Sequence, residues 1–352
     1  MSRFFSQRYR DLTPYTPGEQ PKDTLYLKLN TNESPFPPSP LAQKYAKNAS
    51  GSLNLYSDPE STILKKAGAK ALGVPESSLI FTNSSDETLN FAFMAFCDES
   101  RPAIFPDITY GFYPVFAQVH CVPYREIPLK DDFTIDPADY SGMRGTVFLA
   151  NPNAPTGVLL PLSAIESILK SNPESIVVVD EAYIDFGGES AIALLPEYEN
   201  LLVVRTFSKS RSLAGGRLGI GIANESLIRD LKTIQYSINP YNVNSMTMAA
   251  GAGALEDTEY FEKTRREIIE NRAVLTKKLK ALGFSVLPSA ANFVFAKSPK
   301  ISGEALYLKL KEKKILIRHF SLPRIADYNR ITVGTSDQIE TLIAAIAEIL
   351  EE

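Results

Sequence analysis

Short apolar runs alternate with stretches of helical periodicity over the first two thirds of the chain. Runs rich in β-branched and aromatic side chains predict strands, and apolar residues that recur every three or four positions predict amphipathic helices. The predicted strands are 79–82, 103–105, 122–127, 146–150, 176–179 and 201–205, and the predicted helices are 59–72, 86–96, 111–119 and 162–169. This alternation predicts an α/β fold with a mostly parallel sheet flanked by helices.

The pattern changes after about residue 250. A long helix is predicted over 258–282 and a final helix over the last residues of the chain. Between them we expect strands at 284–287, 292–296, 315–318 and 330–333 and a helix at 303–313. With 352 residues the chain exceeds the roughly 250–300 residues of a single core. We therefore predict an N-terminal arm and small-domain segment (1–38, with a possible strand at 25–29), a large domain (39–250) and a smaller α+β domain (251–352).

Composition and charge narrow the function classes. The chain is 44% hydrophobic with a net charge of −4, so electrostatics gives no reason to expect nucleic acid or an anionic membrane as a partner. No apolar run approaches the roughly 20 residues that span a bilayer, and charges interrupt the N-terminal segment where a signal peptide would be apolar. The two cysteines, Cys97 and Cys121, fit a reducing cytoplasm and are expected to be small buried side chains.

Histidine is scarce, which constrains the chemistry. His120 and His319 are the only two, and neither stands at metal-ligand spacing from a cysteine or from the other. We therefore expect no metal site and no histidine-driven triad. A chain of this size with so few histidines suggests a cofactor that carries the chemistry itself.

The stretch around Lys209 is the first candidate for such a site. Lys209 follows the predicted strand 201–205 and is preceded by Thr206 and Ser208, with Arg217 just beyond two glycines. Hydroxyl groups and a guanidinium are the donors that bind a phosphate, and a lysine held near them can serve as a nucleophile. Taken alone, the stretch fits an ordinary polar turn equally well.

Three other strand ends carry suitable groups. The strand 79–82 is followed by Asn-Ser-Ser-Asp-Glu and a helix, a start that can bind an anion or only cap itself. The strand 176–179 ends in Asp180, whose buried carboxylate needs a partner, and the strand 146–150 ends in the proline-rich loop 151–157. Ligands of open α/β sheets lie at the carboxyl ends of the strands. A lysine, a phosphate site and an aspartate for a ring nitrogen are the set that pyridoxal phosphate requires.

Several motifs in order make the chain similar to a known family. They are Pro14-Tyr15, Leu29-Asn30-Thr31-Asn32-Glu33-Ser34-Pro35, Tyr56-Ser57-Asp58-Pro59, Asn153-Ala154-Pro155-Thr156-Gly157, Asp180-Glu181-Ala182-Tyr183, Thr206-Phe207-Ser208-Lys209 and Arg330-Ile331-Thr332-Val333-Gly334-Thr335. With them the chain resembles the fold-type-I pyridoxal-phosphate aminotransferases, and most closely the histidinol-phosphate aminotransferase family, from about Leu12 to its C-terminus.

The resemblance implies a role for each matched residue at the cofactor. Lys209 would form the Schiff base and move the proton at the substrate Cα, Asp180 would pair with the pyridinium nitrogen, and Tyr183 would hydrogen-bond the phenolic oxygen O3′. The residues that would hold the cofactor phosphate and ring are Ser85, Asp86, Thr206, Ser208, Arg217 and Tyr110.

It also implies partners and substrates. The chain would be a cytoplasmic homodimer in which Tyr56 reaches the neighbouring subunit's phosphate. Arg330 would bind the carboxylate of glutamate or 2-oxoglutarate, and Arg318, Tyr15 and Asn32 would take the phosphate and imidazole ends of histidinol phosphate. The implied reaction gives imidazole-acetol phosphate and L-glutamate in histidine biosynthesis.

The position before Pro155 departs from the family pattern. The family usually has an asparagine there, whose amide bonds O3′, but this chain has Ala154. Either Asn153 turns inward to replace that amide or Tyr183 serves O3′ alone. We also expect a cis peptide between Ala154 and Pro155.

Other interpretations of the same residues remain open. A threonine-phosphate decarboxylase or a broader aromatic aminotransferase would keep the cofactor and most of the motifs. A nicotinamide dehydrogenase would use the glycines of 215–221, but Arg217 breaks the fingerprint spacing and the run does not follow a first strand. A cofactor-binding domain of a regulator would need a DNA-binding module, for which the sequence gives no sign.

Overall fold

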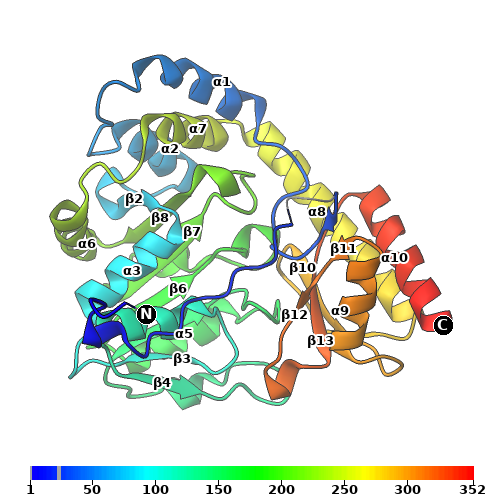
Figure 1. Cartoon of the computed structure of the whole chain (residues 1–352). Helices are drawn as coiled ribbons and strands as arrows, with labels where there is room; N and C mark the ends of the chain where they lie inside the picture. The colour runs from blue at the N-terminus through cyan, green and yellow to red at the C-terminus, as the bar shows by residue number, and fades with distance from the viewer. Residues whose placement is uncertain (1, 22–24) are drawn as a thin grey trace.

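A seven-stranded sheet forms the larger part of the molecule in the computed structural model, which describes residues 2–21 and 25–352 (Figure 1). Its order is β2-β8-β7-β6-β5-β3-β4, and β8 alone runs against the others. The strands are β2 (Leu79–Asn83), β3 (Ala103–Pro106), β4 (Tyr124–Ile127), β5 (Thr146–Ala150), β6 (Val177–Asp180), β7 (Leu201–Thr206) and β8 (Leu218–Ala223). The mostly parallel sheet expected from the sequence is thereby confirmed.

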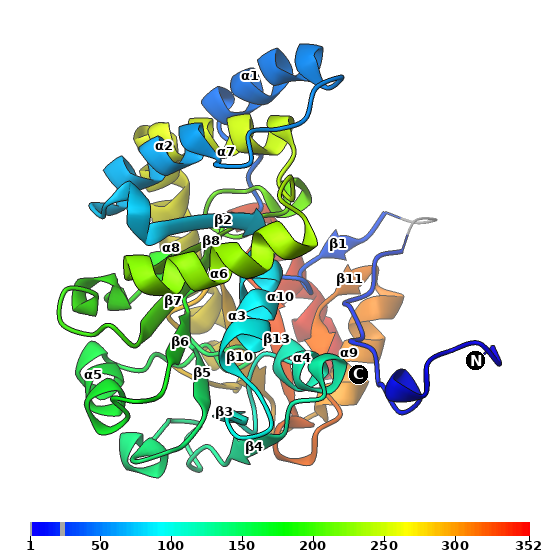
Figure 2. The ribbon, with the colours of Figure 1, turned by 90° about the vertical axis from the view of Figure 1, so that its left-hand side faces the viewer.

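Helices cover both faces of this sheet (Figures 1 and 2). The core on one face includes residues of α2 (Thr62–Leu72), α5 (Leu162–Ser171) and α7 (Ser245–Glu256). The core on the other includes α3 (Ser85–Phe96), α4 (Phe112–His120) and α6 (Glu225–Ile238), and α1 (Pro40–Ala49) packs on α7. In β6, Val177 and Val179 face the first core and Val178 faces the second, which explains why this central strand is apolar throughout.

A separate antiparallel sheet forms the smaller part of the molecule. Its order is β12 (Arg318–His319), β13 (Tyr328–Thr332), β10 (Phe293–Lys297) and β9 (Ser285–Val286). Its core includes α8 (Thr258–Ala281), α9 (Gly303–Glu312) and α10 (Ser336–Glu351). The N-terminal segment joins this part, because β1 (Leu27–Lys28) pairs in parallel with β11 (Ile315–Leu316).

The structure differs from the sequence prediction in several elements. Strand β8 and helices α1, α6 and α7 were not predicted, and the stretch 315–318 contains β11 and the start of β12 rather than one strand. Cys97 is buried as expected, but Cys121 is exposed, so its predicted burial is wrong. The domain boundaries remain predictions, and residues 1 and 22–24 of the predicted arm lie outside the described residues.

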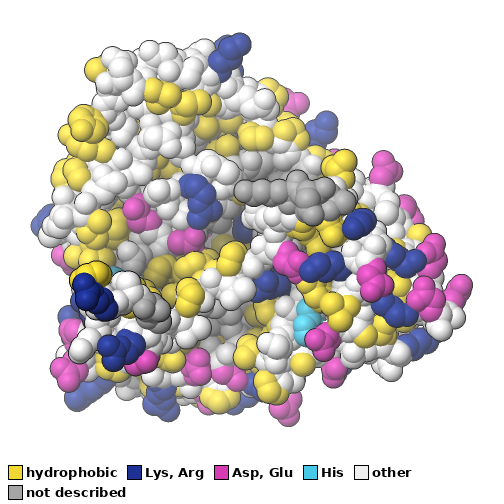
Figure 3. Space-filling model, in the orientation of Figure 1, with side chains coloured by type: hydrophobic (Ala, Val, Ile, Leu, Met, Phe, Trp, Pro, Cys, Tyr) yellow, Lys and Arg dark blue, Asp and Glu magenta, His cyan; other side chains and the backbone are white. Residues whose placement is uncertain are grey.

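The surface carries charges of both signs, as the composition of the chain suggests. On the face drawn in Figure 3, basic and acidic side chains are interspersed with apolar ones. Within the described parts of the chain, no helix is long and apolar enough to cross a membrane. The same residues include no group of three or more His, Cys, Asp or Glu side chains placed to hold a metal ion.

Candidate active site

Two neighbouring cavities share Lys209. The first, of about 430 Å³, is lined by the ends of β5, β6 and β7 and by the start of α3. The second, of about 460 Å³, extends from Lys209 toward β12 and β13 of the small sheet. The residues that line both are Thr31, Tyr110, Ala154, Tyr183 and Lys209. A group bound at the lysine therefore has room on two sides.

The amine of Lys209 is held at this junction. Its Nζ donates to the backbone oxygen of Thr31 at 3.2 Å and lies 5.8 Å from the centre of the Tyr183 ring. Burial lowers the pKa of Lys209 to about 8, and the positive charge of Arg330 acts in the same direction. A large fraction of the amine is therefore neutral near pH 8, the form that attacks a carbonyl.

Asp180 presents a carboxylate at the end of β6. Its Oδ1 accepts from the N–H of Ala182 at 3.2 Å and its Oδ2 accepts from the hydroxyl of Tyr113 at 3.3 Å. The carboxylate is buried and makes no ion pair within the described residues. Burial raises its pKa to about 7. A cationic nitrogen placed beside Asp180 would restore the ionised form.

Donors for an anion also line the first cavity. Ser85 and Asp86 begin α3, where the first N–H groups of a helix have no intrahelical partner. The hydroxyls of Thr206 and Ser208 lie 3.0 Å apart, and Ser208 N–H donates to Thr206 Oγ1 at 3.1 Å. Arg217 adds a guanidinium. This set can hold a phosphate.

Asp86 organises two of these neighbours. Its carboxylate accepts from the Arg217 guanidinium at 3.0 Å and from the Tyr110 hydroxyl at 2.7 Å. Tyr110 and Arg217 are thus directed into the cavity from different elements. Tyr110 and Arg217 lie far apart in the sequence, so their shared contact with Asp86 could not be predicted from spacing.

Gly219 in β8 allows the start of α3 to sit where it does. In the sheet, Gly219 is aligned with Thr82 of β2 and Thr206 of β7. A Cβ on Gly219 would lie 2.3 Å from the carbonyl carbon of Ser84 and 2.3 Å from the nitrogen of Ser85. A side chain at this position would therefore push the helix start away from the hydroxyls of β7.

The second cavity contains two arginines side by side. Arg318 of β12 and Arg330 of β13 are register partners in an antiparallel pair, so their side chains leave the same face of the sheet. Arg330 donates to the backbone oxygen of Asn30 at 3.0 Å, and its buried Nε has no partner within residues 2–21 and 25–352. Arg318 donates to the backbone oxygen of Thr16 at 3.2 Å. This half of the site is built for an anionic ligand.

Aromatic and polar residues complete the second cavity. Tyr15 stacks on Phe112, with ring centres 4.2 Å apart. The amide of Asn32 donates to the Tyr183 hydroxyl at 2.9 Å and accepts from Thr332 at 3.1 Å. Burial raises the pKa of Tyr183, so this phenol stays protonated at neutral pH and can donate a hydrogen bond.

Two predicted residues line neither cavity. Asn153 uses its side chain elsewhere: its amide donates to the backbone oxygen of Ile108 at 2.9 Å and accepts from Thr109 at 3.0 Å. Of the two alternatives at this position, the placement favours the one in which Tyr183 serves alone. The expected cis peptide at Ala154–Pro155 is present, as is a second at Asn151–Pro152.

Tyr56 is the second predicted residue that lines neither cavity. Its side chain is 84% exposed and stacks on Tyr241, with ring centres 4.6 Å apart.

Some lining and contact residues were missed by the sequence analysis. Gln20, Thr31 and Glu33 line the first cavity, and Tyr113 reaches Asp180 from α4. Thr31 and Glu33 belong to the motif 29–35, so the family resemblance could have indicated them. Tyr113 lies in an apolar helix with no marker of polar function, so only the fold reveals it.

Gly219→Ala tests the packing of β8 against α3. We expect a loss of about 1–3 kcal/mol in the free energy of unfolding, because the new methyl group meets backbone atoms that cannot move independently. Urea unfolding measures the change. Gly215→Ala is the matched control, since a Cβ there would have no described atom within 4 Å. Equal stability of the two variants would contradict the close approach.

Comparison with known proteins identifies the family of the chain. The sequence model of the family described as "Aminotransferase class I and II" matches residues 24–346. Histidinol-phosphate aminotransferase 2 of Dechloromonas aromatica (strain RCB) is 49% identical over 354 residues, covering 99% of each chain. The histidinol-phosphate aminotransferase of Brachyspira hyodysenteriae is 47% identical over 353 residues, covering 100% of each.

A solved structure shares the fold. The crystal structure of the Sinorhizobium meliloti histidinol-phosphate aminotransferase in complex with pyridoxal-5′-phosphate superposes with a TM-score of 0.87 at 23% identity, covering 100% of this chain and 98% of that one. Because the family model spans most of the chain and the relatives match end to end, the chain belongs to the class I and II aminotransferases and is a pyridoxal-phosphate-dependent transaminase.

Proposed function

We propose that the chain transfers the amino group of L-histidinol phosphate to 2-oxoglutarate, giving imidazole-acetol phosphate and L-glutamate, in the histidine biosynthesis of the cytoplasm. The names of the relatives support this substrate. The observation that carries the proposal is Arg330. Its guanidinium lies beside Arg318 in the cavity that meets Lys209, and its buried Nε has no hydrogen-bond partner among the described residues. An anionic group of the substrate would supply the missing acceptor.

The first cavity is proposed to hold the cofactor. The N–H groups of Ser85 and Asp86 would bind its phosphate at the helix start. Thr206, Ser208 and Arg217 would bind the same phosphate from the other side. When bound, pyridoxal phosphate supplies a ring that accepts the electrons left on the substrate Cα when its proton is removed.

Asp180 would control the protonation of the ring nitrogen. The pKa of its carboxyl is raised to about 7 by burial, and a cation alongside would lower it again. By the same coupling, the ionised carboxylate holds a proton on the facing nitrogen. The N–H of Ala182 and the hydroxyl of Tyr113 fix the direction in which Asp180 points.

Lys209 would move the proton at the substrate Cα. Released from its bond to the cofactor, the amine is neutral in a substantial fraction near pH 8 and can accept that proton. Tyr183 would donate to O3′. Because the Asn32 amide donates to the Tyr183 oxygen at 2.9 Å, the phenol becomes a stronger donor to its own acceptor.

Tyr56 supports a homodimer. Its ring is 84% exposed and stacked on Tyr241, away from both cavities of its own chain. In the proposed dimer, the Tyr56 hydroxyl would hydrogen-bond the cofactor phosphate held by the neighbouring subunit. Each active site would then be complete only when two chains associate.

Arg330→Lys tests the anion site. The substitution keeps the positive charge but removes the planar fork, so we expect kcat/KM for glutamate and for histidinol phosphate to fall about 30-fold, as loss of roughly 2 kcal/mol implies. Steady-state kinetics with each substrate measure the effect. Arg229→Lys, at an exposed position on α6, should match the parent. Parent-like kinetics in the Arg330 variant would argue against its role.

Tyr113→Phe tests the support of Asp180. Without the hydroxyl, the ionised carboxylate loses a hydrogen bond, so its pKa should rise and the Kd for pyridoxal phosphate should increase about 5–10-fold. Spectroscopic titration of the cofactor-free protein gives the Kd. Tyr140→Phe is the control, because the buried Tyr140 hydroxyl makes no hydrogen bond to any described residue. An unchanged Kd in Tyr113→Phe would mean that the contact does not matter for binding.

The reaction itself has a direct test. Purified protein is incubated with histidinol phosphate and 2-oxoglutarate, and glutamate is measured; its formation is the expected result. Threonine phosphate is supplied in parallel and released CO2 is followed, and phenylalanine and tyrosine replace histidinol phosphate in a third series. No glutamate from histidinol phosphate would overturn the proposal, and CO2 release would favour the decarboxylase.

A further inference from the structure

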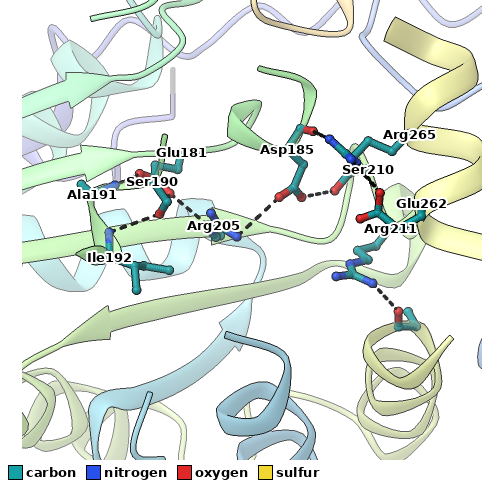
Figure 4. A network of polar contacts seen from close by, with 11 residues as sticks. Glu181, Asp185, Ser190, Ala191, Ile192, Arg205, Ser210, Arg211, Glu262 and Arg265 are labelled. Atoms are coloured by element: carbon teal, nitrogen blue, oxygen red, sulfur yellow. Dashed lines mark hydrogen bonds and ion pairs between the residues drawn. The ribbon is translucent and has the colours of Figure 1, made fainter. Parts of the chain in front are cut away.

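Figure 4 shows a network of charged and hydroxyl side chains that includes Glu181, Asp185, Arg205 and Ser210. Ser210 Oγ donates to Oδ2 of Asp185 at 2.5 Å. Oδ1 of the same carboxylate lies 3.4 Å from Nη1 of Arg205. The Nε of Arg205 in turn donates to Oε2 of Glu181 at 3.0 Å. We call these four residues the Asp185 network.

The network joins the neighbours of two active-site residues. Glu181 follows Asp180 at the end of β6, and Ser210 follows Lys209 after β7. None of the four side chains of the network lines either cavity, so none can touch cofactor or substrate there. The chemistry proposed above leaves the network without a role.

Burial makes these contacts strong. The Glu181 side chain is fully buried, and the side chains of Arg205 and Asp185 are 18% and 24% exposed. Ser210 is buried as well. Hydrogen bonds to charged groups away from water are among the stronger ones, and removing one partner leaves the other unsatisfied. The network therefore resists displacement of the chain on either side of it.

Helix α8, which leads to the small sheet, also contacts the Asp185 network and the residue after Ser210. Arg265 of α8 donates to the backbone oxygen of Asp185 at 3.3 Å. Arg211, next to Ser210, donates to the backbone oxygen of Ala254 at 2.7 Å and its guanidinium lies 3.5 Å from the centre of the Phe261 ring. The segment after Lys209 is thus fixed to α7 and α8 through Arg211, and to the turn after β6 through Ser210 (Figure 4).

We infer that Asp185 is a positioning residue for Lys209 and acts through Ser210. The backbone of Lys209 lies between two anchored serines, since Ser208 N–H is bonded to Thr206 Oγ1 and Ser210 Oγ to Asp185. A lysine side chain has four rotatable bonds of its own, so only a fixed backbone keeps its amine at the meeting point of the two cavities. Arg205 holds the Asp185 carboxylate in the orientation that Ser210 requires.

The inference differs from a purely stabilising role in what it predicts for the lysine. The pKa of Lys209 is lowered to about 8 because the amine is buried. If the Ser210 anchor is lost, the amine reaches more water and its pKa moves up toward the ordinary value of 10.5. A bond that only stabilised the fold would change the melting temperature and leave this pKa where it is.

The test uses the full chain, without cofactor and then loaded with it. The variants are Ser210→Ala, Asp185→Asn and Ser210→Thr, and the matched control is Ser190→Ala. Ser190 donates to Glu181 at 2.6 Å, so its removal breaks a buried bond at the far end of the network. The pKa of the Lys209 amine is read from the pH dependence of its labelling by trace acetic anhydride, with the modified peptide quantified by mass spectrometry.

In Ser210→Ala we expect the Lys209 pKa to rise by about half a unit or more, and kcat of the loaded enzyme to fall about tenfold with KM unchanged. Asp185→Asn should give a smaller change of the same sign, because a neutral amide oxygen is a weaker acceptor. Ser210→Thr, which keeps the hydroxyl, should restore parent values, and Ser190→Ala should change neither pKa nor kcat. Parent-like pKa and kcat in Ser210→Ala and Asp185→Asn would overturn the inference.

Discussion

The site depends on one constraint: the Asp180 carboxylate is buried and forms no ion pair with any residue that the structure describes. Two hydrogen bonds, from Ala182 and Tyr113, do not replace the water that this group loses, and its pKa rises to about 7 as a result. A buried carboxylate at the end of a central strand therefore favours the binding of a positively charged ligand, whose charge would stabilise the ionised form. Lys209, on the adjacent strand end, carries the group that can bind that ligand covalently.

Parallel strands explain why much of the site could be predicted from the sequence. The carboxyl ends of β5, β6 and β7 meet at one edge, so Asp180, Lys209 and the loop after Ala150 had to lie close together. Register explains the arginine pair in the same way, since Arg318 and Arg330 are directly opposite each other. Periodicity failed for α7, whose residues are small or apolar on nearly every side, and for β8, whose glycines resemble a loop.

Contacts set by loop geometry could not be predicted. The orientation of Asn153 depends on bonds to Ile108 and Thr109 that come from a different loop, and no spacing in the sequence indicates them. The bond between Ser210 and Asp185 depends in the same way on how the turn after β6 folds back. Residue types identify which side chains can take part in chemistry, whereas the fold decides which of them face the ligand.

The site is divided into two cavities, and Lys209 lies where they meet. One cavity concentrates anion donors around a helix start, and the other places two arginines on a small sheet that belongs to a different part of the chain. Lys209 lines both, so its amine must be placed accurately enough to meet a group bound in either cavity. The fold supplies that accuracy through two hydrogen bonds that flank Lys209 in the chain. Ser208 N–H donates to Thr206, and the Ser210 hydroxyl donates to Asp185.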